Sequence, residues 1–183
     1  MKTIVIGLGN PILGDDGVGW KVAEEVKKQL PSPRLQHPSP TRAERSGALR
    51  HADEVGRGDR GEGEGNEVDV DFLSLGGISL MEHLISYERA ILIDAVTSDQ
   101  EIGSVIVSKL KEMPDYSAFH TTSAHDTSLQ NALKLGRTMG ANLPEDVTVV
   151  GIATDHIYDF SEELSPPVAE AIPKATEIVI SML

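Results

Sequence analysis

Residues 3–19 read TIVIGLGNPILGDDGVG, a pattern that predicts a strand, a glycine-rich turn and the start of a helix. Its first part, residues 3–8, is a run of β-branched and aliphatic residues that contains Gly7 near its end and is followed by Gly9. Such a run is typical of a strand buried on both faces and followed by a tight turn. From Asp15 the apolar residues take helical spacing, and lysines stand near the end of the segment, where the helix dipole favours them. The apolar residues are Val18, Val22, Val26 and Leu30.

The rest of the chain continues this alternation of strand and helix. We expect strands at 68–75, 90–96, 104–110 and 146–153, and helices at 80–86, 127–139 and 167–183. The alternation favours an α/β fold with three layers, in which a twisted, mostly parallel five-stranded sheet lies between helices on both faces. We expect the first strand to lie at the centre of that sheet.

One segment, residues 31–67, interrupts the pattern. It holds most of the arginines of the chain and no lysine, and it is rich in proline and glycine with few apolar residues. Such a segment cannot bury enough apolar surface to offset the entropy lost on ordering. We therefore predict a single domain over residues 1–183 with a mobile insert at 31–67. The alternative for the insert is an arm that binds a partner.

The composition excludes several classes of partner and chemistry. The net charge of -13 argues against general binding of nucleic acid and against anionic membranes. The chain has no cysteine, which removes disulfides and thiolate chemistry and fits a reducing compartment. The N-terminus leaves no room for a signal peptide, and no apolar run reaches the ~20 residues of a membrane helix. We expect a soluble, cytoplasmic protein.

The glycine-rich turn after the first strand suggests a dinucleotide-binding fingerprint. The third glycine of that fingerprint, however, falls on Ile12, and no acidic residue marks the end of a second strand. We therefore expect no nucleotide cofactor.

Acidic residues at two places in the chain are better candidates for a functional site. Asp15 and Asp16 stand where the chain re-enters a helix at the carboxyl end of the sheet, which is the edge where open α/β folds bind ligands. Asp15 alone could be a helix N-cap, so Asp16 needs a separate reason. Asp94 is a carboxylate inside an apolar strand, near its carboxyl end, and a buried carboxylate must be paired, protonated or bound to a metal. A structural cap of the following turn is the alternative for Asp94.

His125 joins these carboxylates because it precedes the predicted helix 127–139. One imidazole and two carboxylates form a mixed ligand set suited to a divalent ion such as Ni, Zn, Mn or Fe. A solvated or capping histidine is the alternative. The signatures HExxH and G-x-S-x-G are missing from the sequence. Possible neighbours of the site are His120, Asp155 and His156, whereas we expect His37, His51 and His83 to lie on the surface.

Five blocks of the sequence, in order, resemble the hydrogenase maturation endopeptidases. They are residues 7–19 (GLGNPILGDDGVG), 75–84 (LGGISLMEHL), 91–96 (ILIDAV), 123–133 (SAHDTSLQNAL) and 147–153 (VTVVGIA), the last followed by ELSPPVAEAIPKA at 163–175. The resemblance implies a five-stranded sheet between helices. It also implies an aspartic-type endopeptidase that removes the C-terminal extension of a nickel-iron hydrogenase large-subunit precursor after nickel insertion.

The resemblance also implies a set of site residues. By motif, the catalytic and metal-binding positions carry over to Asp16, Asp94 and His125, and the nickel is supplied by the substrate. Gly76 and Gly77 match a glycine pair near the cleft, which implies substrate binding along bare backbone. The insert at 31–67 and the segment 153–156 depart from the family pattern. A non-catalytic nickel-binding or metal-sensing maturation factor of the same fold is the alternative function.

Overall fold

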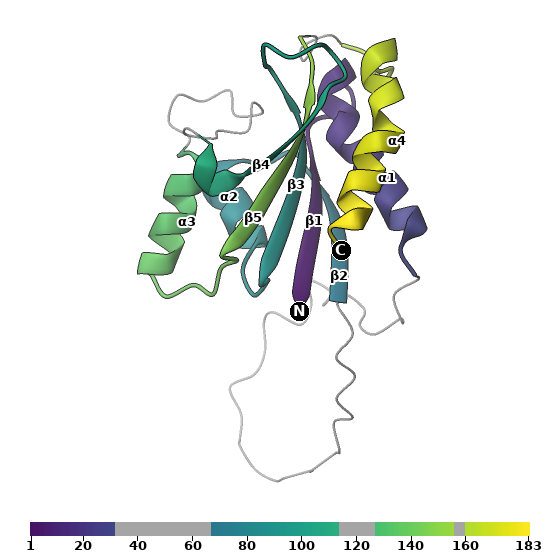
Figure 1. Cartoon of the computed structure of the whole chain (residues 1–183). Coiled ribbons are helices and arrows are strands. Elements are labelled where there is room, and N and C mark those ends of the chain that lie inside the picture. Colours follow the sequence, from purple (N-terminus) through teal and green to yellow (C-terminus); the bar gives the residue numbers. More distant parts are fainter. Residues whose placement is uncertain (32–66, 114–126, 156–159) are drawn as a thin grey trace, which may run out of the picture.

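The computed structural model describes residues 1–31, 67–113, 127–155 and 160–183 (Figure 1). The elements in chain order are β1 (Lys2–Leu8), the 3₁₀ helix η1 (Gly14–Gly17), α1 (Val18–Gln29), β2 (Glu67–Leu73), α2 (Gly77–His83), β3 (Arg89–Val96), β4 (Val105–Lys109), the 3₁₀ helix η3 (Leu110–Glu112), α3 (Leu129–Thr138), β5 (Asp146–Ala153) and α4 (Pro166–Ser181). The predicted insert lies outside the described residues except for its ends, Pro31 and Glu67.

The five strands form one sheet in the order β2-β1-β3-β5-β4. All neighbouring pairs are parallel except β4 with β5, which are antiparallel. The prediction of a mostly parallel five-stranded sheet is therefore confirmed. The expectation that the first strand is central was wrong, because β3 holds that place and β1 lies between β2 and β3. Both strands are apolar on both faces, so their composition alone does not separate their positions.

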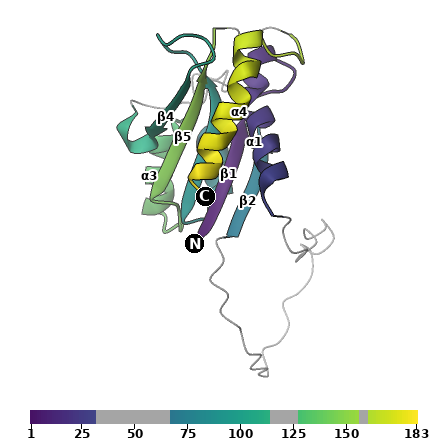
Figure 2. The same cartoon turned by 45° about the vertical axis from the view of Figure 1, so that its right-hand side comes forward.

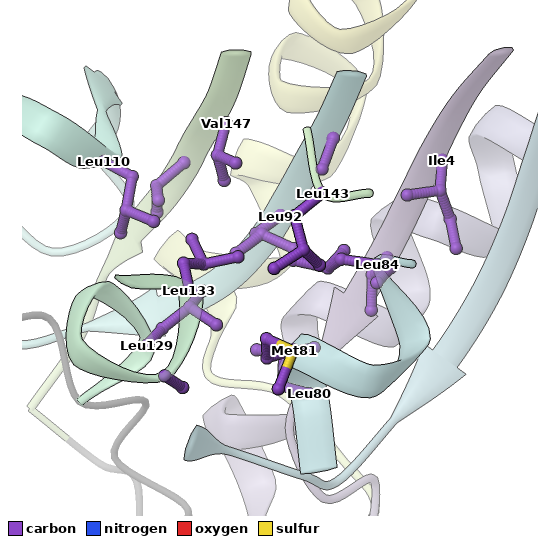
Figure 3. Packing of buried hydrophobic residues seen from close by; sticks show 14 of the residues in the cluster. Ile4, Leu80, Met81, Leu84, Leu92, Leu110, Leu129, Leu133, Leu143 and Val147 are labelled. Atoms are coloured by element: carbon purple, nitrogen blue, oxygen red, sulfur yellow. The ribbon is translucent and has the colours of Figure 1, made fainter. Parts of the chain in front are cut away.

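Helices cover both faces of the sheet, as Figures 1 and 2 show. One buried cluster joins the sheet to α1 and α4, and a second joins the opposite face to α2 and α3. Figure 3 shows the second cluster, where leucines of the two short helices meet Leu92 of β3. Side chains alternate along β1 and β3 between the two clusters, as expected for strands buried on both faces.

Helix α1 lies unusually close to the sheet because both surfaces carry glycine. A Cβ atom at Gly7 would lie 2.4 Å from the Gly19 carbonyl oxygen, and one at Gly19 would lie 2.3 Å from the carbonyl oxygens of Leu8 and Ile93. These distances leave no room for any side chain. Gly7, the first glycine of the suggested nucleotide fingerprint, thus has a packing role between α1 and the sheet.

Two predicted helix boundaries were wrong by several residues. The segment from Asp15 is a 3₁₀ turn, and the α-helix begins only at Val18. Helix α2 spans Gly77–His83, three residues earlier than the predicted 80–86. It ends before Ser86, whose φ of 73° is left-handed, and the Ser86 N–H donates to the Asn142 carbonyl at 2.8 Å. No helix among the described residues is long and apolar enough to cross a membrane.

Candidate functional site

Asp94 lies near the carboxyl end of the central strand. It pairs with Gly151 of β5, and its side chain is fully buried. Because Ala90 and Leu92 of the same strand belong to the cluster beneath α2 and α3, the alternation of a strand directs Asp94 to that same face. Burial of a carboxylate at such a position requires hydrogen-bonding or ionic partners. Asp94 is therefore a polar residue near the carboxyl end of β3, on a face of the strand that is otherwise apolar.

Asp16 reaches the same edge of the sheet from the 3₁₀ turn η1. It is only 3% exposed, and its Oδ2 accepts the Asn10 N–H at 2.6 Å. The turn lies directly over the end of β1, since a Cβ atom at Gly9 would be 1.8 Å from the Asp16 carbonyl oxygen. The turn also packs against β3, the strand of Asp94. The fold thus brings both carboxylates to the carboxyl edge, as predicted for a parallel sheet.

Asp15, the neighbour of Asp16, is held toward the other side of the sheet. Its carboxylate accepts the Thr154 hydroxyl at 2.7 Å, the Ser165 N–H at 2.6 Å and the Ser165 hydroxyl at 2.7 Å. Ser165 is the N-cap residue of α4. The hypothesis that Asp15 caps the first helix was wrong, because Gly17 is the N-cap of α1 and makes no side-chain cap bond. Asp15 instead fastens the start of α4 to the turn.

The glycine pair at 76 and 77 lies at the start of α2. Gly77 is buried with a left-handed φ of +52°, and a Cβ atom there would be 2.7 Å from the Thr127 carbonyl oxygen. This contact joins α2 to the residue that leads into α3. The substrate-binding role of Gly76 and Gly77 stays a prediction, and the close contact with Thr127 is a structural reason for glycine at the second position.

Several predicted residues lie outside the described residues: His37, His51, His120, His125 and His156. Of the others, Asp155 is exposed just after β5, and His83 is exposed on α2 with its Nδ1 3.8 Å from Asp71. Among the residues that the structure describes, no group of three His, Asp or Glu side chains could hold a metal ion. The described part of the predicted ligand set is therefore the pair Asp16 and Asp94.

Sequence reasoning missed the supporting residues Asn10, Thr154 and Ser165. Asn10 supports Asp16 through its backbone N–H, which every residue except proline would supply, so the identity of its side chain gives no signal. Thr154 and Ser165 carry no signal either, because their hydrogen bonds to Asp15 span 139 and 150 residues of the chain.

Fold and site together define an open α/β protein with two buried carboxylates at the edge where such folds bind ligands. Among solved structures, the hydrogenase maturating endopeptidase HybD from Escherichia coli has the same fold, with a TM-score of 0.66 and 21% sequence identity over 100% of this chain and 92% of that one. The [NiFe] hydrogenase maturation protease HybD from Thermococcus kodakarensis gives a TM-score of 0.56 and 22% identity over 100% and 99% of the two chains.

Sequence comparison identifies the family. The hydrogenase maturation protease model matches residues 65–182, more than half of the chain. The hydrogenase expression/formation protein HupD from Rhizobium leguminosarum bv. viciae is 25% identical over 182 residues, which cover 100% of this chain and 74% of the relative. The hydrogenase expression/formation protein HoxM from Azotobacter vinelandii is 22% identical over a region that covers 98% of this chain and 71% of the length of HoxM. The chain belongs to the hydrogenase maturation protease family, and it is a hydrolase of the endopeptidase class.

Proposed function

We propose that Asp16, Asp94 and His125 form the working site of this hydrogenase maturation endopeptidase. In this proposal the enzyme is of the aspartic type and removes the C-terminal extension from the large-subunit precursor of a nickel-iron hydrogenase after nickel has been inserted. The partner is that precursor, in the cytoplasm, and neither nucleic acid nor a membrane takes part.

The contrast between Asp15 and Asp16 carries the proposal. Both carboxylates are buried in one short turn, and three hydrogen bonds to Thr154 and Ser165 explain Asp15 as a structural residue. Asp16 takes no part in those bonds. It stands at the same edge as Asp94, and two carboxylates at one edge supply oxygen donors that a divalent cation can use.

The chemistry of the donors fits nickel. Carboxylate oxygens from Asp16 and Asp94 with an imidazole nitrogen from His125 make a mixed set that a borderline divalent ion accepts. In this proposal the nickel belongs to the precursor, and the enzyme has no resident cofactor. When bound, the ion supplies Lewis-acid polarisation of a nearby carbonyl. The protein itself holds the two carboxylates in place. The Asn10 N–H positions Asp16, and strand β3 positions Asp94.

Of the two predicted substrate-binding glycines, Gly76 supports the proposal because its backbone carries no side chain. Gly76 is partly buried in an extended conformation, with φ of -137° and ψ of -177°, and serves as the N-cap of α2. An extended backbone without a side chain lets a peptide approach closely. We expect the substrate tail to run past Gly76, while Gly77 is occupied by its contact with Thr127.

One incubation tests the proposal. The full-length enzyme is mixed with a large-subunit precursor prepared with and without nickel, and the released tail is identified by mass. We expect cleavage only of the nickel-loaded precursor, and we expect Asp16→Asn, Asp94→Asn and His125→Gln each to abolish it. Each change removes the charge or the imidazole and leaves a polar side chain of similar size, and the circular dichroism spectrum and melting temperature report whether the fold survives.

The outcomes separate the parts of the proposal. Cleavage of the precursor at the wild-type rate by any of these variants removes that residue from the site. Equal cleavage with and without nickel removes the role of the ion. Neither the fold nor the comparisons favour the alternative of a non-catalytic nickel-binding factor, and release of a tail by the wild type excludes it.

A further inference from the structure

A pocket opens between α1 and the edge strand β2, outside the carboxylate pair. Its volume is ≈600 Å³. Trp20 and Phe72 form its aromatic wall, with ring centroids 5.6 Å apart and planes inclined at 54°, and Pro11 also lines it. The Trp20 indole N–H donates to the Leu73 carbonyl at 3.3 Å, so the ring is held in place. Figure 2 shows α1 beside β2. We call this site the Trp20 pocket.

The rim of the Trp20 pocket is basic, unlike the protein as a whole. Lys21, Lys27 and Lys28 line it together with one acid, Glu24, whereas the full chain carries a net charge of -13. Lys28 is paired with Glu24 and Glu25 at 3.5 and 2.8 Å. Within the described residues, Lys21 and Lys27 have no carboxylate partner, and the Lys27 ammonium stands 5.4 Å from the centroid of the Phe72 ring.

The Trp20 pocket is connected to the carboxylate pair through a short stretch of chain. Pro11 lines the pocket, and its neighbour Asn10 donates its N–H to Asp16. Pro11 is also packed on the turn that carries Asp16, because a Cβ atom at Gly17 would lie 2.8 Å from the Pro11 Cα. A peptide bound in the pocket would therefore leave it beside the carboxyl edge of the sheet.

We infer that the Trp20 pocket is a docking site for an acidic peptide segment with a large apolar side chain, supplied by the protein substrate. The apolar side chain would fill the space between Trp20 and Phe72, and the acids would pair with Lys21 and Lys27. A concave apolar site with a few convergent charges is the usual form of a peptide or ligand site, and tryptophan is enriched where binding energy concentrates. The choice of an acidic partner rests on charge complementarity. That the segment comes from the substrate rests on the function proposed above.

Trp20 is the only tryptophan of the chain, so its fluorescence reports the pocket directly. The probe is a short capped peptide in which Leu-Phe is flanked on both sides by Asp and Glu, titrated into the full-length protein. We expect a saturable change in Trp20 emission that weakens as salt is added. The same peptide with lysines in place of the acids should give no saturable change.

Charge-reversal variants provide the matched comparison. The double variant Lys21→Glu, Lys27→Glu should weaken binding of the acidic peptide by about tenfold or more, because rim charges are replaced by repulsive ones. The control is Lys134→Glu, Lys174→Glu, which changes the net charge equally at exposed positions on α3 and α4. The control should bind as the wild type does.

Four results would overturn the inference. They are no emission change with the acidic peptide, equal binding by the double variant, a change produced by anionic phosphatidylglycerol vesicles but not by peptide, and an emission shift that follows protein concentration together with a dimer on size-exclusion chromatography. The last result would assign the pocket to a second copy of the chain.

Processing kinetics then distinguish this inference from the proposed active site. With nickel-loaded precursor, Lys21→Glu, Lys27→Glu should raise KM by about tenfold and leave kcat unchanged, since docking is binding shared by ground and transition states. The fluorescence titration needs no cleavage, so it stands or falls independently of Asp16 and Asp94. An unchanged KM for the double variant, with peptide binding lost, would remove the substrate as the source of the segment.

Discussion

Asp15 and Asp16 are adjacent, buried and chemically identical, yet they belong to different parts of the molecule. Asp15 is tied to Thr154 and to Ser165, so it holds the beginning of α4 against the turn. Asp16 receives the Asn10 N–H and stands at the edge that carries Asp94. A 3₁₀ turn has about three residues per turn, so consecutive side chains point roughly 120° apart. The turn η1 thereby separates the carboxylate that holds the start of α4 from the carboxylate that we propose for the active site.

The largest effect is expected at Asp16. We predict that Asp16→Asn lowers processing of the nickel-loaded precursor by at least about 100-fold, because loss of a ligand should exceed the loss seen when a supporting residue is removed. The amide oxygen can still accept the Asn10 N–H, so the urea midpoint should stay close to that of the wild type. A large fall in the midpoint would mean that Asp16 is a structural residue like its neighbour.

The converse effect is expected at Asp15. We predict that Asp15→Ala lowers the free energy of unfolding by about 3 kcal/mol, because the partly buried Ser165 N–H and the buried Thr154 hydroxyl lose their acceptor. Urea denaturation followed by circular dichroism measures this. At a temperature where the variant is folded, cleavage should remain near the wild-type rate. Loss of cleavage in the fully folded variant would end the division of roles between the two residues.

A smaller effect is expected on the α2 side of the site. Gly77→Ala places a Cβ atom in a left-handed conformation and against the Thr127 carbonyl, so we predict a loss of about 2 kcal/mol in the free energy of unfolding. The matched control is Gly140→Ala, where φ is also positive at +84° but nothing lies within 4 Å of the added atom. Equal losses in the two variants would show that the contact with Thr127 contributes nothing.

The smallest effect is expected far from both carboxylates, at Tyr87. Its hydroxyl donates to Asp69 at 2.7 Å, and burial followed by that hydrogen bond raises the pKa of Tyr87 above its ordinary value of 10.0. The folded state therefore keeps the phenol proton at pH values where the unfolded chain has lost it. This contribution to stability is complete below the unfolded pKa and is lost as the pH rises through the folded one.

We predict that Tyr87→Phe costs about 1 kcal/mol near neutral pH, through the lost hydrogen bond to Asp69. The variant should also show a smaller loss of stability than the wild type between about pH 9 and pH 11, since the group whose pKa is raised is gone. Urea unfolding at several pH values measures both effects. Cleavage should be unchanged, and parallel pH profiles of the two proteins would contradict the role of the phenol.

Much of the architecture was predictable from local patterns. The strand predicted at 146–153 is observed as Asp146–Ala153, and the strand predicted at 90–96 as Arg89–Val96. Continuous runs of β-branched residues predict buried strands, because such side chains pack well in a sheet that is covered on both faces. Helix α2 was harder, because its start depends on the left-handed Gly77 and on contact with a residue fifty positions away. The spacing of apolar residues along the sequence does not predict such a contact.

The candidate site was predictable in the same uneven way. Asp94 was identified because a charged residue inside an apolar strand has few structural explanations. Asp16 was preferred over Asp15 because a helix cap could account for Asp15. The supporting bonds of Asp15 come from residues far along the chain, and no periodicity of the first segment refers to them. The role of His125 stays a prediction from the sequence.

Local sequence was enough to predict the strands, the approximate places of the helices, and carboxylates at the carboxyl ends of β1 and β3, because these follow from the chemistry of neighbouring residues. The order of the strands, and the role of Asp15 in holding α4 rather than in capping α1, depend on the tertiary structure. The physical reason is that a hydrogen bond across 150 residues exists only after the sheet has closed the distance between its partners.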